Sequence, residues 1–156
     1  GKFLSKNGPW DLLVKDKRIQ LKTMVSDKPV LLAPDLSVTP IKVPHRDEYS
    51  DTVGFLIKGP NQSALFIPDI DRWDKWDRDI RELADSVDLL FLDGTFGSPD
   101  ELPGRDLSNI PHPFMSDTRK KLQGSSGKLW FIHLNHSNPS LGRDKDVVRQ
   151  GMRFGL

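Results

Sequence analysis

Short apolar runs, each followed by a turn signal, recur along the chain and predict a fold built on a β-sheet. Apolar or alternating segments predict strands at 18–25, 29–33, 37–43, 53–58, 64–68, 88–92 and 129–132. The turn Gly59-Pro60-Asn61 separates two of these strands and indicates a β-hairpin over 53–68.

Helices are predicted between several of these strands. The clearest predicted helix has an apolar face that consists of Trp76, Ile80, Leu83, Ala84 and Val87. Two short helices are expected on either side of the Gly8-Pro9 break, and further helices over 116–122 and 144–151. The order strand, helix, strand with apolar strands indicates a βαβ-like unit in a covered sheet, so we expect an α/β fold.

Composition narrows the class of protein. The 156 residues are enough for one domain with a core, and 23 basic against 22 acidic residues give no positive excess that would favour nucleic acid. No apolar run approaches the length of a membrane helix, so no membrane partner is expected. The absence of cysteine excludes disulfides and thiolate ligands and fits a reducing compartment, so we expect a cytoplasmic protein.

Candidate metal-binding and catalytic residues follow the predicted strands. His45, Asp69, Asp93 and His133 each lie at the carboxyl end of a predicted strand, and His112 lies in a later loop. Ligands of sheet-based α/β proteins gather at such strand ends. Imidazoles and carboxylates on one sheet edge suit a borderline divalent metal such as zinc, manganese or iron. Two metals bridged by a carboxylate would activate a water molecule.

Each of these residues also has an ordinary structural interpretation. A single histidine near a strand end is usually a polar loop residue. Asp69 is also compatible with a cap, and Asp93-Gly94 with a simple turn. His136 and Asn138 are compatible with hydrogen bonding within their own loop. The pattern alone leaves both interpretations open.

The order of these residues resembles the second half of the metallo-β-lactamase superfamily. The resemblance is strongest to the branch that contains the pyrroloquinoline-quinone biosynthesis protein B, related phosphodiesterases and tRNA-processing nucleases. The segments that carry it, in the family's order, are VPHRDEYSDTVGFLI, ALFIPDID, DLLFLDGTF, IPHPFMSDTRKKL and LWFIHLNHSNP. The opening KFLSKNGPWDLLV is also similar to this branch, so the resemblance covers nearly the whole chain.

The resemblance implies a fold and a metal centre. Residues 1–156 would form the C-terminal half of a four-layer αββα sandwich, contributing one mixed β-sheet with outer helices. His45 would bind one metal ion, Asp69 would bridge two ions, and His133 would bind the second. The expected metal is zinc, with iron or manganese as alternatives, and two ions are expected in the intact protein.

The resemblance also implies a catalytic pair. Asp93 and His112 would hold a substrate oxygen or protonate a leaving group, a role that suits an imidazole whose pKa an adjacent carboxylate raises. His136 and Asn138 are expected to contact the metal ligands or the substrate.

The sequence departs from the family in one respect. The family's early motif His-x-His-x-Asp-His, which supplies most ligands of both metals, does not occur. We favour the explanation that the chain, which begins at Gly1, is the C-terminal half of a longer protein; a degenerate remnant is the alternative. Half a sandwich would expose the inner face of its sheet, so we expect association with the N-terminal half or a homodimer.

Two functions follow as hypotheses. The first is a metal-dependent hydrolase in which a metal-bound hydroxide attacks an ester or phosphodiester of a small-molecule substrate, or, in the quinone-biosynthesis branch, an oxygen-using enzyme. The second is a non-catalytic binding module or degenerate remnant on the same scaffold. A nuclease has weak support because the charge is balanced. The loops contain no residue pattern that indicates a class of substrate.

Overall fold

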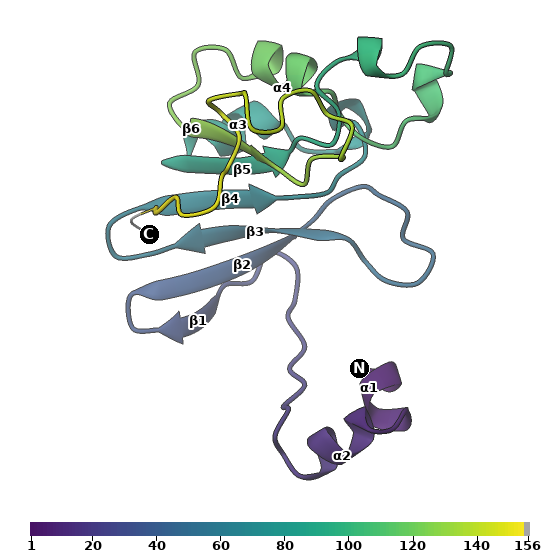
Figure 1. The fold of residues 1–156 in the computed structure, drawn as a ribbon. Helices are drawn as coiled ribbons and strands as arrows, with labels where there is room; N and C mark the ends of the chain where they lie inside the picture. The colour runs from purple at the N-terminus through teal and green to yellow at the C-terminus, as the bar shows by residue number, and fades with distance from the viewer. Residues whose placement is uncertain (155–156) are drawn as a thin grey trace.

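The computed structural model describes residues 1–154, which form a six-stranded sheet with its strands in sequence order (Figure 1). The strands are β1 (Val30–Ala33), β2 (Leu36–Lys42), β3 (Val53–Lys58), β4 (Ser63–Ile67), β5 (Leu89–Asp93) and β6 (Lys128–Ile132). Most of the predicted strands are therefore confirmed, as is the hairpin, which consists of the antiparallel pair β3 and β4.

Strand direction brings four carboxyl ends to one edge of the sheet. Neighbours from β1 to β4 are antiparallel, whereas β4, β5 and β6 are parallel. Because β2 and β4 both run opposite to β3, β2 points the same way as β4, β5 and β6. The mixed sheet of the α/β prediction is confirmed, and its parallel part is connected through helices as in βαβ units.

The helices are short. They are α1 (Lys2–Lys6), α2 (Trp10–Lys15), α3 (Ile80–Asp85) and α4 (Met115–Lys121), with 3₁₀ turns η1 (Trp73–Lys75), η2 (Pro99–Glu101) and η3 (Leu107–Asn109). In Figure 1, α1 and α2 lie apart from the sheet, beyond β1, whereas α3 and α4 lie beside β4 to β6. No helix in the described part of the chain is long and apolar enough to cross a membrane.

One face of the sheet carries the core. Side chains from neighbouring strands form two rows on this face. One row consists of Leu56, Leu65, Leu90 and Leu129, and the other consists of Ile41, Ile67, Leu92 and Phe131. Ile80 and Ala84 of α3 pack on these rows together with Trp73 and Trp76. Burying each such large side chain stabilises the fold by roughly 1.5–3 kcal/mol. The packed rows therefore fix the positions of the strand ends.

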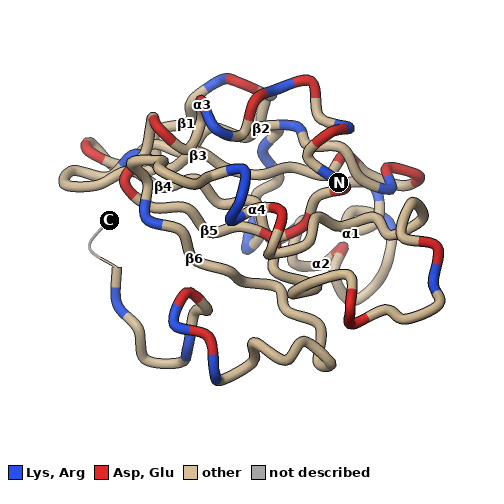
Figure 2. The backbone as a smooth tube through the Cα atoms, turned by 90° about the horizontal axis from the view of Figure 1, so that it is seen from above, with Lys and Arg blue, Asp and Glu red and all other residues tan. Residues whose placement is uncertain are grey.

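The opposite face of the sheet carries a further apolar row. Its members, aligned across five strands, are Pro40, Phe55, Phe66, Phe91 and Trp130. Phe154 packs edge-on against Phe91 and Trp130, with ring centroids 4.8 and 5.2 Å apart. Figure 2 shows charged residues interspersed on loops and helices, while β4 to β6 carry almost none. That another half or a second copy covers this face stays a prediction.

The predicted helix over 144–151 is wrong. This segment forms turns and one isolated bridge, in which Val147 pairs with Phe131 beside β6. The Phe131 N–H donates to the Asp146 carbonyl at 2.7 Å, and the Val148 N–H donates to the Phe131 carbonyl at 3.0 Å. Pairing with the edge of the sheet replaces the hydrogen bonds that a helix would have made within itself.

Two other expectations need correction. Residues 18–25 form no strand: among them only Ile19 is even half-buried, and β1 instead occupies the sheet edge next to β2. The helix expected to carry Trp76 begins only at Ile80, because the Asp79 carboxylate caps it by accepting from the Arg81 N–H at 2.8 Å. The two helices around Gly8-Pro9 and the helix near 116–122 are confirmed.

Candidate metal and catalytic site

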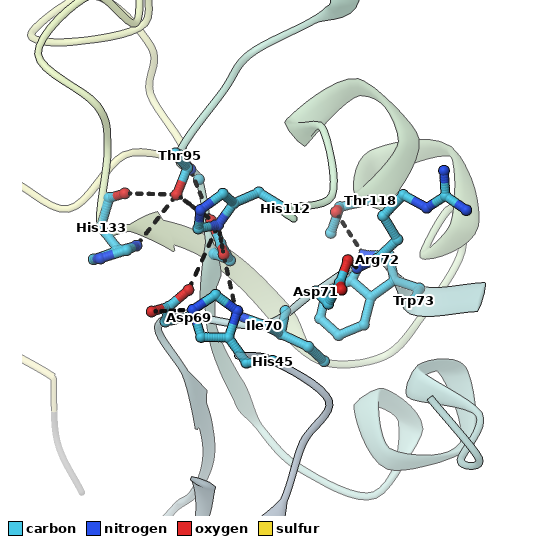
Figure 3. Close-up of polar contacts among 12 residues, drawn as sticks. His45, Asp69, Ile70, Asp71, Arg72, Trp73, Thr95, His112, Thr118 and His133 are labelled. Atoms are coloured by element: carbon cyan, nitrogen blue, oxygen red, sulfur yellow. Dashed lines mark hydrogen bonds and ion pairs between the residues drawn. The ribbon is translucent and has the colours of Figure 1, made fainter. Parts of the chain in front are cut away.

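The predicted site residues meet at one edge of the sheet because the strands before them end there (Figure 3). Asp69 follows β4, Asp93 ends β5, His133 follows β6, and His112 lies in the loop before α4. Each of these four places a ligand-type atom within 4.8 Å of the others. His45, which follows β2, lies outside this group but puts its Nε2 3.2 Å from Asp69 Oδ2.

The Asp93 carboxylate is completely buried and is saturated with hydrogen bonds. Its Oδ2 lies 2.8 Å from His112 Nδ1 and accepts from the Ile70 N–H at 3.2 Å. Its Oδ1 accepts from the N–H and the hydroxyl of Thr95 at 2.8 and 2.7 Å. Four donors occupy the four lone-pair positions of a carboxylate, which leaves Asp93 to orient His112 rather than to bind a metal.

The surroundings of His112 change the pKa of its imidazole. Burial of the ring lowers the pKa of His112, but the hydrogen bond and negative charge of Asp93 act against burial, helped by the charges of Asp69 and Asp71. The net effect raises the pKa of His112 above its ordinary value. A histidine that keeps its proton to higher pH is suited to act as a general acid.

Asp69 and His45 differ from Asp93 in having unpartnered buried atoms. No described residue hydrogen-bonds to Asp69 Oδ1 or to His45 Nδ1, although both atoms are buried. His112 Nδ1 lies 3.5 Å from Asp69 Oδ1, but its hydrogen bond goes to Asp93. Unpartnered buried polar atoms are costly and call for a partner. Carboxylate and imidazole atoms with lone pairs still unused fit a borderline divalent metal.

His133 has a strained backbone. Its φ is +58°, in the left-handed region that residues other than glycine rarely adopt. Thr95 Oγ1 lies 3.2 Å from both His133 Nδ1 and the His133 carbonyl oxygen. His133 itself is exposed. Strain of this kind is retained where the surrounding structure requires it, often at functional sites.

Sequence reasoning missed Thr95, which is buried and lies within hydrogen-bond distance of three site residues. Its hydroxyl contacts Asp93, His112 and His133 (Figure 3). The available signal was Asp-Gly-Thr directly after a buried strand, because a hydroxyl two residues beyond a carboxylate commonly bonds back to it.

The two remaining candidates occupy different environments. Asn138 is buried, and its amide donates to the Gly94 carbonyl at 2.8 Å, so it supports the turn that carries Thr95. His136 is exposed and forms no hydrogen bond or ion pair with any residue from 1 to 154. Asn138 therefore contributes to the shape of the site, whereas a contact of His136 with the metal ligands or the substrate stays a prediction.

A pocket of about 460 Å³ opens beside His112. Its walls are mainly apolar and consist of Trp73, Leu107, Pro113 and Phe114. Its rim includes Arg72, Asp74, Asp117 and Lys121. The Trp73 indole N–H donates to the buried Thr118 hydroxyl at 2.9 Å, which fixes one wall. The pocket thus places a largely apolar cavity next to the imidazole of the Asp93–His112 pair.

Comparison of the sequence with known proteins identifies a family and a relative. The profile of the β-lactamase superfamily domain matches residues 3–138. Coenzyme PQQ synthesis protein B of Azotobacter vinelandii is 26% identical, over 77% of this chain and 46% of that protein. The chain therefore spans about half the length of the curated relative it matches.

Two solved structures resemble the chain in fold. The crystal structure of Zn²⁺-bound PqqB from Methylobacterium extorquens gives a TM-score of 0.77 at 22% identity, over 99% of this chain and 59% of that one. The metallo-β-lactamase fold protein YhfI from Bacillus subtilis gives 0.54 at 15% identity, over 80% of this chain and 49% of that one.

Proposed function

Because the chain belongs to the family of β-lactamase superfamily domains, we propose that it carries part of the site of a metal-dependent hydrolase. His45, Asp69 and His133 are the proposed metal ligands, with Asp69 between two ions. The proposed metal is zinc, since the related protein from Methylobacterium extorquens is described as Zn²⁺-bound. When bound, such a metal lowers the pKa of a water molecule and polarises an ester or phosphodiester oxygen.

The contrast between the two carboxylates carries this proposal. Every lone pair of Asp93 is in use, whereas Asp69 Oδ1 and the neighbouring His45 Nδ1 are buried without a partner. A metal at Asp69 would give a partner to a carboxylate oxygen that the described residues leave without one. The same edge therefore supports two tasks, metal binding at Asp69 and proton transfer at His112.

His112 is the proposed general acid. Because Asp93 holds its Nδ1, the proton that it delivers must leave from Nε2 to the leaving-group oxygen. The pocket beside His112 supports this assignment, since a leaving group next to the imidazole would have a cavity of about 460 Å³ to occupy. Its apolar walls favour a leaving group with apolar surface and help to exclude water.

The test compares two histidine variants in the zinc-loaded protein. Hydrolysis of bis(para-nitrophenyl) phosphate and para-nitrophenyl acetate is followed for the wild type, His112→Gln and His136→Gln. We expect His112→Gln to lower kcat by about 10²–10⁴ while zinc stays bound, because only the acid is lost. His136→Gln is the matched control and should retain both zinc and stability.

Two results would contradict the proposal. Full turnover by His112→Gln would remove the general acid from the mechanism. Zinc binding without turnover of either ester, measured on a protein that carries the whole site, would favour the non-catalytic binding module instead.

A further inference from the structure

Thr95 connects the two histidines of the candidate site through one hydroxyl group. Its Oγ1 lies 2.7 Å from Asp93 Oδ1, and 3.2 Å from the Nδ1 atoms of both His112 and His133. The residue is only 8% exposed, so water does not compete freely for these contacts. The arrangement therefore fixes where the hydroxyl proton and the two imidazole protons lie.

The hydroxyl proton goes to Asp93. A threonine hydroxyl donates one hydrogen bond and accepts two. The Asp93 carboxylate is the closest acceptor and carries charge, whereas the His133 carbonyl is a more distant neutral acceptor at 3.2 Å. With its proton directed to Asp93, Thr95 Oγ1 faces the two imidazoles only as an acceptor.

Both imidazoles then carry a proton on Nδ1, but they direct it to different acceptors. The Nδ1 proton of His112 is directed at Asp93 Oδ2, which is closer at 2.8 Å than Thr95 Oγ1 is at 3.2 Å. His133 Nδ1 has Thr95 Oγ1 as its side-chain partner. Because Thr95 Oγ1 acts as the acceptor in this contact, His133 Nδ1 must carry the N–H. A neutral imidazole carries only one N–H. The lone pair of His133 is then on Nε2.

We propose that Thr95 is a positioning residue that holds His133 in the tautomer protonated at Nδ1, so that Nε2 presents its lone pair to a divalent metal. The final clause of this proposal rests on the proposed function. Histidines that bind metals commonly donate their second N–H to an oxygen, which fixes the tautomer and ring orientation. Here a single carboxylate, Asp93, orients His112 directly and His133 through Thr95.

Both partners of this contact are held in place by the backbone. The Thr95 carbonyl accepts from the Asn135 N–H at 3.0 Å, and the Asn138 amide holds the preceding Gly94 carbonyl at 2.8 Å. His133, with its φ of +58°, turns both its ring and its carbonyl oxygen toward Thr95 Oγ1. The contact therefore joins two rigidly placed residues, and removal of the hydroxyl leaves the His133 ring without its acceptor.

The experiment reads the proton position in the metal-free protein. Proton–nitrogen NMR correlation spectra of isotopically labelled histidine distinguish the two tautomers at a pH where the imidazoles are neutral. His133→Gln assigns the His133 signals by their disappearance. Thr95→Val removes the hydroxyl at nearly constant shape, and Thr95→Ser retains it as the matched control. Zinc Kd is measured for the same proteins.

We expect the proton on Nδ1 of His133 in the wild type and in Thr95→Ser. In Thr95→Val, the population should move toward Nε2–H, and the zinc Kd should rise by about 10–100-fold. A wild-type His133 protonated at Nε2 would overturn the proposal, and that result needs no variant to fold. An unchanged Nδ1 proton in Thr95→Val would also overturn it. An Nδ1 proton in a wild type that binds no zinc would support the role of Thr95 while contradicting the proposed function.

Discussion

Aspartates lie at both ends of the parallel strands, and the two ends use them differently. At the amino end, Asp88 Oδ2 accepts from the N–H and hydroxyl of Ser63, both at 2.7 Å, and Asp85 Oδ1 accepts from the Ser125 hydroxyl at 2.8 Å. These bonds connect neighbouring loops. At the carboxyl end, Asp69 Oδ1 is buried without a partner. The aspartates of the amino end connect loops, whereas Asp69 at the carboxyl end keeps an oxygen without a partner among the described residues.

Cavity size does not distinguish the two ends. The pocket at the amino end, which Asp85 and Asp88 line, measures about 510 Å³, compared with about 460 Å³ beside His112. Histidines do distinguish them, because His45, His112 and His133 all lie at the carboxyl end. Unused lone pairs beside imidazoles therefore mark the chemical site more clearly than a cavity or a strand end does.

Replacement of Asp93 by alanine is expected to have the largest effect on stability. It leaves the buried donors of Thr95, Ile70 and His112 without an acceptor, which should lower the free energy of unfolding by roughly 3–5 kcal/mol. Asp88→Ala is the matched variant at the amino end. Its effect should be smaller, since Asp88 is exposed and its bonds to Ser63 lie at the surface, where water can replace it. Urea unfolding of both variants measures the difference, and equal losses would contradict the contrast between the two ends.

The two ends should also respond to pH in opposite directions. Hydrogen bonds from the Ser63 N–H and hydroxyl lower the pKa of Asp88, so its contribution to stability is present above about pH 3.9 and is lost as the pH falls. The pKa of His112 is raised, so its contribution is present below about pH 6.5 and is lost as the pH rises through the folded-state value. Unfolding of metal-free protein across pH tests both.

Single variants separate these two contributions. Asp88→Asn should reduce the loss of stability on the acid side without abolishing it, since the pKa values of other aspartates such as Asp71 and Asp85 are also lowered. It should leave the alkaline side unchanged, whereas His112→Gln should reduce the loss on the alkaline side and leave the acid side unchanged. If both variants changed the same side, the assignment of the two pKa shifts to opposite ends of the sheet would be wrong.

The strand ends could be predicted because the sequence marks them directly. Each apolar run stops at a polar residue or turn signal, so Asp69, Asp93 and His133 were placed at the ends of their strands from pattern alone. The resemblance to the metallo-β-lactamase fold, which rested on the same segments, is confirmed. That His45 shares their edge requires both β2 and β4 to run antiparallel to β3, and the hairpin signal indicated only the pairing of β3 with β4.

The remaining features depend on contacts between distant residues. Thr95 meets His112 and His133 across 17 and 38 positions of sequence, and no local pattern reports such a meeting. The non-helical path of residues 144–151 depends on Val147 pairing with Phe131, which overrides the local helical pattern. Histidine adopts a positive φ more often than most residues, but residue type alone does not single out His133 from His45, His112 and His136.

Isothermal titration of the wild type, Asp69→Ala and Asp88→Ala with zinc tests whether the metal binds at the carboxyl end of the sheet. Asp69→Ala is expected to weaken zinc binding by about 100-fold or more, because it removes the carboxylate with unused lone pairs. Asp88→Ala should bind zinc as the wild type does. Equal zinc affinity and stoichiometry in the wild type and Asp69→Ala would contradict the assignment of the metal site to the carboxyl end of the sheet.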